Sequence, residues 1–322
     1  MSVLVTGVAG FIGAEVAGAL LARGEAVVGV DNFSDQYDPV LKFARLKPLR
    51  ETKGFTFLEA DVAEREAMLG LAGKHGDLDR IVHLAAQSGV RQSMVDPYVY
   101  AQTNVMGHLV LLELARGLKD LKHFVYASAS SVYGANRKLP FSVADRVDHP
   151  VSLYAATKRA DELMTETYSH LYGLKATGLR YFTTYGPWGR PDMSPYVFAK
   201  AIHEGRPIVL THQGVLKRDY SYVDDMVAGT LAVLDKPPAD AGHRIYNLGA
   251  ARSEDLVQVI ALFEKAFARK AIVELTPGEP GTLPETAADI ADTTRDFGWT
   301  PRVAVEEGIP KFVAWFKAYN RL

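Results

Sequence analysis

Short and almost wholly apolar runs recur through the first half of the chain. They are four to six residues long, are rich in β-branched side chains, and do not alternate between polar and apolar positions. Such runs are typical of strands that are buried on both faces of a parallel sheet. The predicted strands are Val3–Thr6, Ala26–Asp31, Thr56–Ala60, Arg80–Ala85 and Phe124–Ser128.

Longer segments with helical spacing separate these strands. The clearest is Ile12–Arg23, where apolar residues recur on one face and Gly24 follows as a stop signal. The residues of that face are Ile12, Val16, Ala19 and Leu20. The repeated strand–helix units predict an α/β fold with a doubly wound parallel sheet of the Rossmann type. Ligands of such sheets bind at the carboxyl ends of the strands.

The second half of the chain has a different pattern, in which Gly/Pro-rich loops separate short strands and helices. This pattern predicts a smaller α/β lobe. The expected elements are a Gly/Pro-rich loop at Thr183–Ser194, a helix at Tyr196–Gly205, strands at Pro207–Thr211 and Arg244–Leu248, a helix at Ser253–Phe267 and a Pro/Gly loop at Pro277–Pro284. We therefore expect a dinucleotide-binding domain over residues 1–180, completed by late sheet strands near 220–250. An interleaved, substrate-binding lobe would occupy residues 181–322.

Composition narrows the classes of function. The 322 residues, 48% of them hydrophobic, suffice for this organisation, and a net charge of −2 offers no basic field for nucleic acid. The absence of cysteine excludes disulfides and thiolate sites and agrees with a cytoplasmic location. We predict no membrane association, because no apolar run reaches about 18 residues, and the N-terminus has the pattern of a strand and not of a signal peptide. The nine histidines lack a ligand spacing, so we predict no metal site.

A glycine-rich loop joins the first strand to the first helix. Its glycines are spaced G-x-x-G-x-x-G, which permits a tight turn and lets backbone N–H groups approach a pyrophosphate at the helix N-terminus. The predicted cofactor-binding residues are Gly7, Gly10, Phe11, Ile12 and Gly13. The alternative is an ordinary strand–helix turn.

An acidic residue ends the second predicted strand. A carboxylate at Asp31 would accept hydrogen bonds from ribose hydroxyls and repel a 2′-phosphate, and the following Asn32 offers no cation for one. This favours NAD over NADP, although Asp31 could simply begin a loop. Positions after the third and fourth strands are expected to meet the same cofactor. They are Asp61 and Val62, and Leu84, Ala85 and Ala86.

Tyr154 and Lys158 form a Y-x-x-x-K pair that shares one face of a helix. A tyrosine needs its pKa lowered by about 3 units to act as a base near pH 7. An ammonium at about 4 Å supplies roughly that much at an effective dielectric near 20. We therefore predict that Tyr154 is the proton acceptor for an alcohol. The alternative is a chance pair on the surface.

Together these motifs resemble the extended short-chain dehydrogenase/reductase family over essentially the whole chain. The matching stretches also include Ser130–Gly134, Gly89–Arg91 and Arg218–Asp225. The stretch Arg180–Met193 is similar to the UDP-glucuronate 4-epimerase group. The resemblance implies NAD, a UDP-sugar substrate, and C4 oxidation to a 4-keto sugar followed by rotation and reduction. It also implies a homodimer formed through Val99–Ala115 and Ala155–Tyr172.

The residues before Val132 separate the chemistries of the resembling families. Related dehydratases carry Asp-Glu there and decarboxylases carry Glu, whereas this chain has Ser130 and Ser131. The resemblance therefore assigns Ser130, Ser131 and Thr183 to a uronate carboxylate, although these hydroxyls could merely satisfy a strand end. Ala129 departs from the family, which usually has Ser or Thr there. Ser128, Ser130 or a water could replace the lost hydroxyl.

Three arginines are candidates for pairing with the diphosphate or the uronate. Arg190 and Arg218 lie in the matching motifs, and Arg91 is a weaker candidate. Two other functions stay open. One is another NAD-dependent epimerase or reductase, acting on UDP-hexoses. The other is a decayed NAD-sensing module, which Ala129 alone suggests.

Overall fold

A seven-stranded parallel sheet organises the protein. The computed structural model describes residues 1–278 and 283–322, so part of the predicted loop Pro277–Pro284 lies outside the described residues. The strand order is β11-β6-β5-β4-β1-β2-β3. The strands are β1 Ser2–Thr6, β2 Ala26–Asp31, β3 Phe55–Glu59, β4 Leu78–His83, β5 His123–Ala129, β6 Lys175–Tyr181 and β11 Gly242–Leu248. The predicted doubly wound α/β fold is confirmed.

The predicted strands differ from the observed ones mainly at their ends. Strand β4 ends at His83, whereas the sequence predicted that it continues to Ala85. Leu84 N–H still donates to Thr6 O at 3.2 Å, but Ala85 N–H donates to the Thr6 hydroxyl, so the backbone leaves the sheet there. Strand β6 was not predicted, because Lys175, Thr177 and Arg180 interrupt its apolar run.

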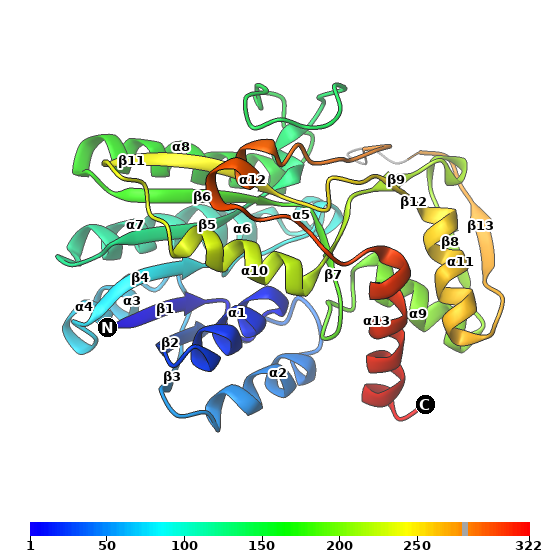
Figure 1. The fold of residues 1–322 in the computed structure, drawn as a ribbon, viewed down its shortest axis with the longest axis horizontal. Coiled ribbons are helices and arrows are strands. Elements are labelled where there is room, and N and C mark those ends of the chain that lie inside the picture. Colours follow the sequence, from blue (N-terminus) through cyan, green and yellow to red (C-terminus); the bar gives the residue numbers. More distant parts are fainter. Residues whose placement is uncertain (279–282) are drawn as a thin grey trace.

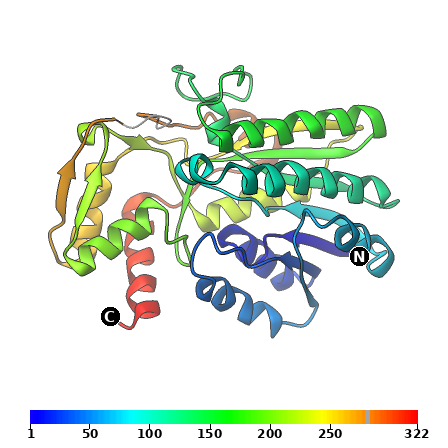
Figure 2. The same ribbon diagram turned by 180° about the vertical axis from the view of Figure 1, so that it is seen from behind.

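Helices cover both faces of the sheet (Figures 1 and 2). In Figure 1, α1 Phe11–Ala22, α2 Val40–Arg50, α10 Val223–Leu234 and α12 Ala291–Phe297 lie toward the viewer. Figure 2 shows the other face, where α7 Gly107–Gly117 and α8 Leu153–Tyr172 run side by side. Their neighbours are α3 Arg65–Leu69, α4 Leu71–Lys74, α5 Val90–Val95, α6 Pro97–Tyr100 and the π-helix η1 Ala101–Met106.

Helix α1 is buried on more than the one face that its spacing predicted. Val16 and Leu20 are buried as expected, but Ile12 and Ala19 are only partly buried. Further buried positions are Phe11, Gly13, Ala14, Ala17 and Leu21. The cause is that α1 packs against α2 and α10 as well as the sheet.

A smaller lobe lies at the right of Figure 1 and contains the C-terminus. Its helices are α9 Ser194–Glu204, α11 Leu256–Phe267 and α13 Val305–Asn320. Three pairs of short strands complete it: β8 Pro207–Leu210 with β13 Ile272–Leu275, β7 Thr183–Tyr185 with β10 Tyr220–Tyr222, and β9 Lys217–Arg218 with β12 Glu254–Asp255. The 3₁₀ turns are η2 Ser130–Tyr133 and η3 His212–Gly214.

Three predictions for the second half need correction. The expected loop at Thr183–Ser194 begins with strand β7. The expected helix from Ser253 begins only at Leu256, because Asp255 caps it by accepting from Val257 N–H at 2.8 Å. Of the late strands expected near 220–250, β11 joins the large sheet, but β10 pairs with β7 instead. A continuous apolar core connects the lobe to α1 and α10.

Candidate active site

The carboxyl ends of the central strands border a cavity of about 420 Å³. Residues from the glycine loop, β2, β5, α8 and the segments after β4 and β6 line it. The predicted site residues on its wall are Gly7, Gly10, Phe11, Ile12, Gly13, Asp31, Asn32, Val62, Leu84, Ala85, Ala86, Ser130, Ser131, Tyr154, Lys158, Thr183 and Arg190. Asp61, Arg91 and Arg218 do not line it.

The glycine loop is packed so tightly that side chains cannot replace its hydrogens. A Cβ on Gly7 would lie 2.8 Å from Ala85 N, and Gly7 also has a φ of +68°. A Cβ on Gly13 would lie 2.1 Å from Gly7 O. Gly10 is the N-cap of α1 and supplies no side chain to the first N–H groups of the helix. A helix N-terminus that opens on a cavity in this way fits a pyrophosphate.

Asp31 presents a largely buried carboxylate on the cavity wall. Its Oδ2 accepts from Ala9 N–H at 3.0 Å and its Oδ1 from Phe33 N–H at 2.9 Å. Each oxygen keeps a second lone pair, so both can still accept ribose hydroxyls. These donors fix the carboxylate and fit the adenosine half of NAD.

Asp61 acts indirectly and does not meet the cavity as predicted. Its Oδ2 accepts from Asn32 Nδ2 at 2.8 Å, and its Oδ1 accepts from Ala63 N–H at 2.8 Å. Asp61 therefore orients Asn32. Lys42, which was not predicted, also lines the cavity from α2 and donates to Ser34 O at 2.7 Å. Its burial depends on how α2 packs, so no local signal in the sequence indicated it.

Tyr154 and Lys158 lie on the first turns of α8, which Ser152 caps by accepting from Ala155 N–H at 3.1 Å. Lys158 Nζ donates to Ala127 O at 3.0 Å and to Asp161 Oδ2 at 3.1 Å. Burial raises the pKa of Tyr154, and the charges of Lys158 and Arg190 lower it by less. The lowered pKa that the sequence predicted is therefore absent without ligands, because desolvation outweighs the two cations.

The hydroxyls around Ala129 differ in their availability. Ser128 Oγ donates to Glu162 Oε1 at 2.6 Å, so its proton is not available to a ligand. Ser130 lines the cavity at the start of η2. Ser131 Oγ is buried and has no hydrogen-bond partner among the described residues. An unsatisfied hydroxyl on a cavity wall is suited to a polar ligand.

The three candidate arginines have different surroundings. Arg190 lines the cavity, donates to Ser88 Oγ, and pairs with Asp192 through Nε at 3.0 Å. Arg218 Nη1 donates to Lys217 O at 2.8 Å and to Pro284 O at 3.2 Å, away from the cavity. Arg91 lies exposed on α5. Of the three, Arg190 is the one that lines the cavity.

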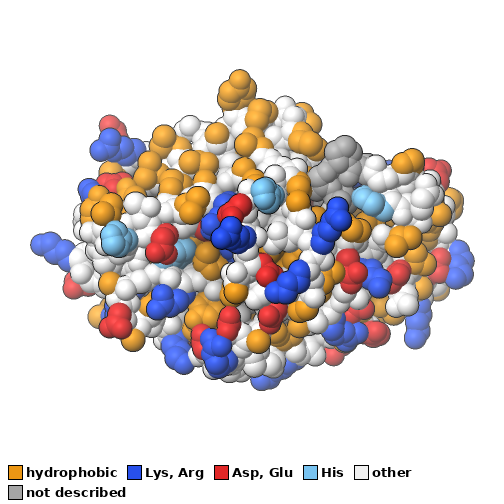
Figure 3. All heavy atoms as spheres, turned by 90° about the horizontal axis from the view of Figure 1, so that it is seen from above, with side chains coloured by type: hydrophobic (Ala, Val, Ile, Leu, Met, Phe, Trp, Pro, Cys, Tyr) orange, Lys and Arg blue, Asp and Glu red, His pale blue; other side chains and the backbone are white. Residues whose placement is uncertain are grey.

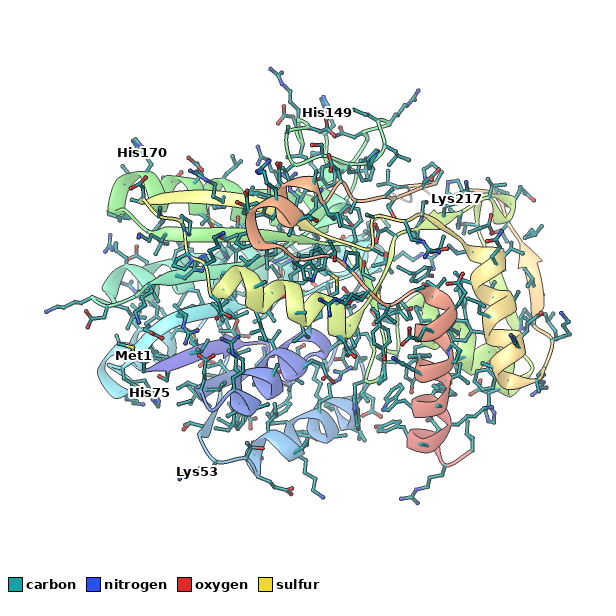
Figure 4. All side chains as sticks on the ribbon, viewed as in Figure 1. Met1, Lys53, His75, His149, His170 and Lys217 are labelled. Carbon is teal, nitrogen blue, oxygen red and sulfur yellow. The ribbon has the colours of Figure 1, made fainter. Side chains whose placement is uncertain are left out.

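Neither the histidines nor the face drawn in Figure 3 indicates a metal centre or a patch of one charge in the part of the chain that the structure describes. His75, His149 and His170 point outward from separate parts of the molecule (Figure 4), and the described residues hold no group of three potential metal ligands. Cations and carboxylates are interspersed over the face in Figure 3. Among the helices of the described residues, none has the length and apolar character needed to cross a bilayer.

Comparison with known proteins identifies the family. Residues 3–249 match the family described as NAD dependent epimerase/dehydratase. The chain belongs to this family. Family membership confirms the predicted NAD dependence, which the glycine loop, the Asp31 carboxylate and the cavity between them fit.

Several members of the NAD-dependent epimerase/dehydratase family match along nearly the whole chain. UDP-glucuronate 4-epimerase 4 of Arabidopsis thaliana is 42% identical, over 99% of this chain and 76% of the relative. A Rhizobium meliloti protein named "Probable UDP-glucuronate 4-epimerase" is 41% identical, over 98% and 97%. A crystal structure of the UDP-glucuronic acid 4-epimerase from Bacillus cereus, with UDP-glucuronic acid and NAD, superposes with a TM-score of 0.93 at 31% identity. It covers 99% of this chain and 100% of that one.

Proposed function

We propose that this protein is an NAD-dependent isomerase that interconverts UDP-glucuronate and UDP-galacturonate at C4. The observation that carries the proposal is the match of 99% of the chain to UDP-glucuronate 4-epimerases, both in sequence and in a fold that superposes with a TM-score of 0.93. The cavity at the carboxyl ends of the strands supports the same reaction, because Tyr154, Lys158 and the glycine loop share its wall.

In the proposed reaction, Tyr154 moves the proton of the C4 hydroxyl. The glycine loop and Asp31 would hold NAD, which would supply a reversible acceptor for the C4 hydride. The Tyr154 phenolate accepts the hydroxyl proton as the C4 ketone forms, and the phenol returns that proton after the sugar has turned its other face. Lys158 stabilises the phenolate through its positive charge. The reaction causes no net oxidation or reduction, because the proton and the hydride both return to the sugar.

Residues on the cavity wall would hold the uronate carboxylate away from the ketone. A 4-keto uronate is a β-keto acid, which loses CO₂ when its C5–C6 bond aligns with the carbonyl. The unsatisfied Ser131 Oγ, with Ser130 and Thr183, offers hydroxyl donors that can fix the carboxylate orientation. Arg190 adds a cation on the same wall, so it is the candidate for charge pairing. Arg218 and Arg91 have no such position in the structure.

A homodimer in the cytoplasm is the proposed form of the enzyme. Exposed apolar side chains on the sheet face that bears α7 and α8 support pairing there. Leu163 on α8 is 53% exposed, Leu171 on α8 is 59% exposed, and Met106 on η1 is 44% exposed. Burial of these residues against a second copy would remove apolar surface from water.

The proposed function is tested by incubating the purified protein with UDP-glucuronate and, separately, with UDP-glucose. Proton NMR should show the coupling pattern of UDP-galacturonate appearing from the first substrate and little conversion of the second. Turnover of UDP-glucose with inertness toward UDP-glucuronate would replace the proposal by a neutral UDP-hexose epimerase. NAD binding without turnover of any nucleotide-sugar would favour a sensing module.

A further inference from the structure

A buried carboxylate, that of Asp161, lies next to the Lys158 ammonium and does not line the cavity. Asp161 follows Lys158 by three residues on α8, and its Oδ2 lies 3.1 Å from Lys158 Nζ. The Lys158 side chain is 3% exposed and that of Asp161 is 0% exposed. Since solvent screens a buried ion pair weakly, the charge state of Asp161 acts strongly on Lys158.

The other oxygen of this carboxylate has no hydrogen bond. Asp161 Oδ1 is buried without a partner among the described residues. Among the described residues, the donor to the Asp161 side chain is the Lys158 ammonium. Burial consequently raises the pKa of Asp161 to about 7, against the lowering effect of Lys158. A buried carboxylate with a purely structural role would be stabilised by further hydrogen-bond donors. Asp161 instead interacts with Lys158, a residue of the cavity wall.

Among the groups around this pair, Asp161 is the one whose charge changes near neutral pH. Those that interact with Asp161, Lys158 or Tyr154 are His83 on β4, Tyr100 on α6, His108 on α7, Tyr126 on β5, Glu162 on α8 and Arg190 after β7. Burial lowers the pKa of His83 to about 3 and that of His108 well below its usual value, so both stay neutral. Glu162 and Arg180 pair with each other at 2.8 Å.

We infer that Asp161 is a positioning residue for the reaction: it holds the Lys158 ammonium and cancels part of its charge, which sets the pH at which Tyr154 accepts a proton. The inference rests on the proposed function, in which Tyr154 is the proton acceptor. With Ala127 O and Asp161 Oδ2 bound, one of the three ammonium protons is left for a ligand in the cavity. An ionised Asp161 also opposes formation of the phenolate.

The size of the effect follows from the helix geometry. Tyr154 and Asp161 are seven residues apart on α8, which is a rise of about 10.5 Å. At an effective dielectric near 20, one unit charge at that separation changes a pKa by about one unit. Because the charge of Asp161 itself changes with pH, we expect an observed displacement of about half to one pH unit.

The test compares pH profiles of wild type, Asp161→Asn and Glu166→Gln in UDP-glucuronate epimerisation. Asparagine keeps the shape of Asp161 and can still accept from Lys158 Nζ, but it carries no charge. We expect the acid limb of the kcat profile to move to lower pH by about half to one unit. Glu166→Gln removes an exposed carboxylate from the same helix and should leave the limb in place.

A second measurement needs no turnover. The phenolate absorbance of the NAD-bound protein, taken as a difference from Tyr154→Phe, should titrate at lower pH in Asp161→Asn than in wild type. Asp161→Ala should show the same displacement if the asparagine variant does not fold. Coincident midpoints in a folded neutral variant and in wild type would overturn the inference. Wild-type protein that leaves UDP-glucuronate unchanged would overturn the proposed function instead, and the absorbance titration would still decide the role of Asp161.

Discussion

At the scale of single residues, burial and hydrogen-bond partners distinguish the hydroxyls at the end of β5. Ser128 is committed to Glu162, whereas Ser131 is unsatisfied and Ala129 presents only a methyl group to the cavity. The family resemblance places a hydroxyl at position 129, next to the reacting hydroxyl of the sugar. In the proposed reaction, residue 129 therefore supplies no hydrogen bond to the reacting hydroxyl, unlike its counterpart in the resembling family.

Restoring that hydroxyl should accelerate the reaction. Ala129 lines the cavity, so the added atoms of Ala129→Thr can extend into it. We expect kcat on UDP-glucuronate to rise by about 10- to 100-fold with a smaller change in KM, since positioned proton-transfer groups contribute about 10² to 10⁴. Steady-state kinetics by NMR would measure this, with Ser128→Ala as the comparison for a hydroxyl that faces the interior. An unchanged or lower kcat would show that the site works without a hydroxyl at 129.

The buried Asp161 should also make the free energy of unfolding depend on pH. Its pKa is about 7 in the folded protein against 3.8 for an exposed aspartate. Between these values the folded state holds a proton that the unfolded state has lost, so the free energy of unfolding falls as pH rises from about 4 to about 7. Urea unfolding at pH 5 and pH 7 should show a smaller fall for Asp161→Asn than for wild type. Equal falls in the two proteins would contradict the raised pKa.

At the scale of elements, buried ion pairs fix α8 against the sheet. Arg180 on β6 donates to Glu162 on α8 through Nε at 2.8 Å and through Nη2 at 2.9 Å. The Arg180 guanidinium also lies over the Tyr133 ring, 4.8 Å from its centroid. These contacts join α8, β6 and η2, the elements around Tyr154 and Ser131. A shift of α8 would therefore move the proton acceptor relative to the substrate wall.

Removing one partner of this pair should cost stability. Glu162→Gln leaves the Arg180 guanidinium, 2% exposed, without a counter-charge, and uncompensated buried charges cost about 3–5 kcal/mol. We expect urea unfolding to show a loss of that order. Glu166→Gln, on the exposed side of the same helix, should change the free energy of unfolding by less than about 0.5 kcal/mol. Similar losses in the two variants would argue against a specific role for the pair.

The contrast between β1 and β6 explains what the sequence could and could not predict. Continuous apolar runs and a strand–turn–helix context suffice for β1, the glycine loop and Asp31, because the information is local. Strand β6 carries Arg180, whose burial makes sense only with Glu162, 18 residues away in the chain. Likewise, Asp61, Arg91 and Arg218 stand next to recognisable motifs, but their orientation depends on how loops fold back. The hydrogen bonds of Lys158 to Ala127 O and Asp161 could not be predicted either, because they also depend on tertiary packing.

At the scale of the whole molecule, the lobe and the sheet domain share one core. The apolar cluster that includes α1 and α10 continues into α9, α11 and α13. Arg45 on α2 reinforces this connection, because its Nε donates to Trp188 O at 3.0 Å, next to Gly189 and Arg190. The segment that carries Arg190 is thus hydrogen-bonded to α2, a helix that also lines the cavity. The predicted role of the lobe in substrate binding remains a prediction.

The proposed homodimer makes a prediction at this scale. Leu163→Glu places a charge on the exposed apolar side of α8 and should shift the protein from dimer to monomer. Size-exclusion chromatography with light scattering measures the mass. Val209→Glu is the matched control, because Val209 is 55% exposed on β8 of the lobe and should leave the mass unchanged. A wild-type protein of monomer mass would contradict the proposed dimer outright.

The central claim is that C4 loses and regains the same hydride in the site built around Tyr154. The most direct measurement uses UDP-glucuronate that carries deuterium at C4, with the product analysed by NMR and mass spectrometry. We expect UDP-galacturonate that retains the deuterium at C4 in ordinary water, and no product from Tyr154→Phe beyond about a hundredth of the wild-type rate. Product whose C4 deuterium has been lost to solvent, or full activity without the phenol, would contradict it.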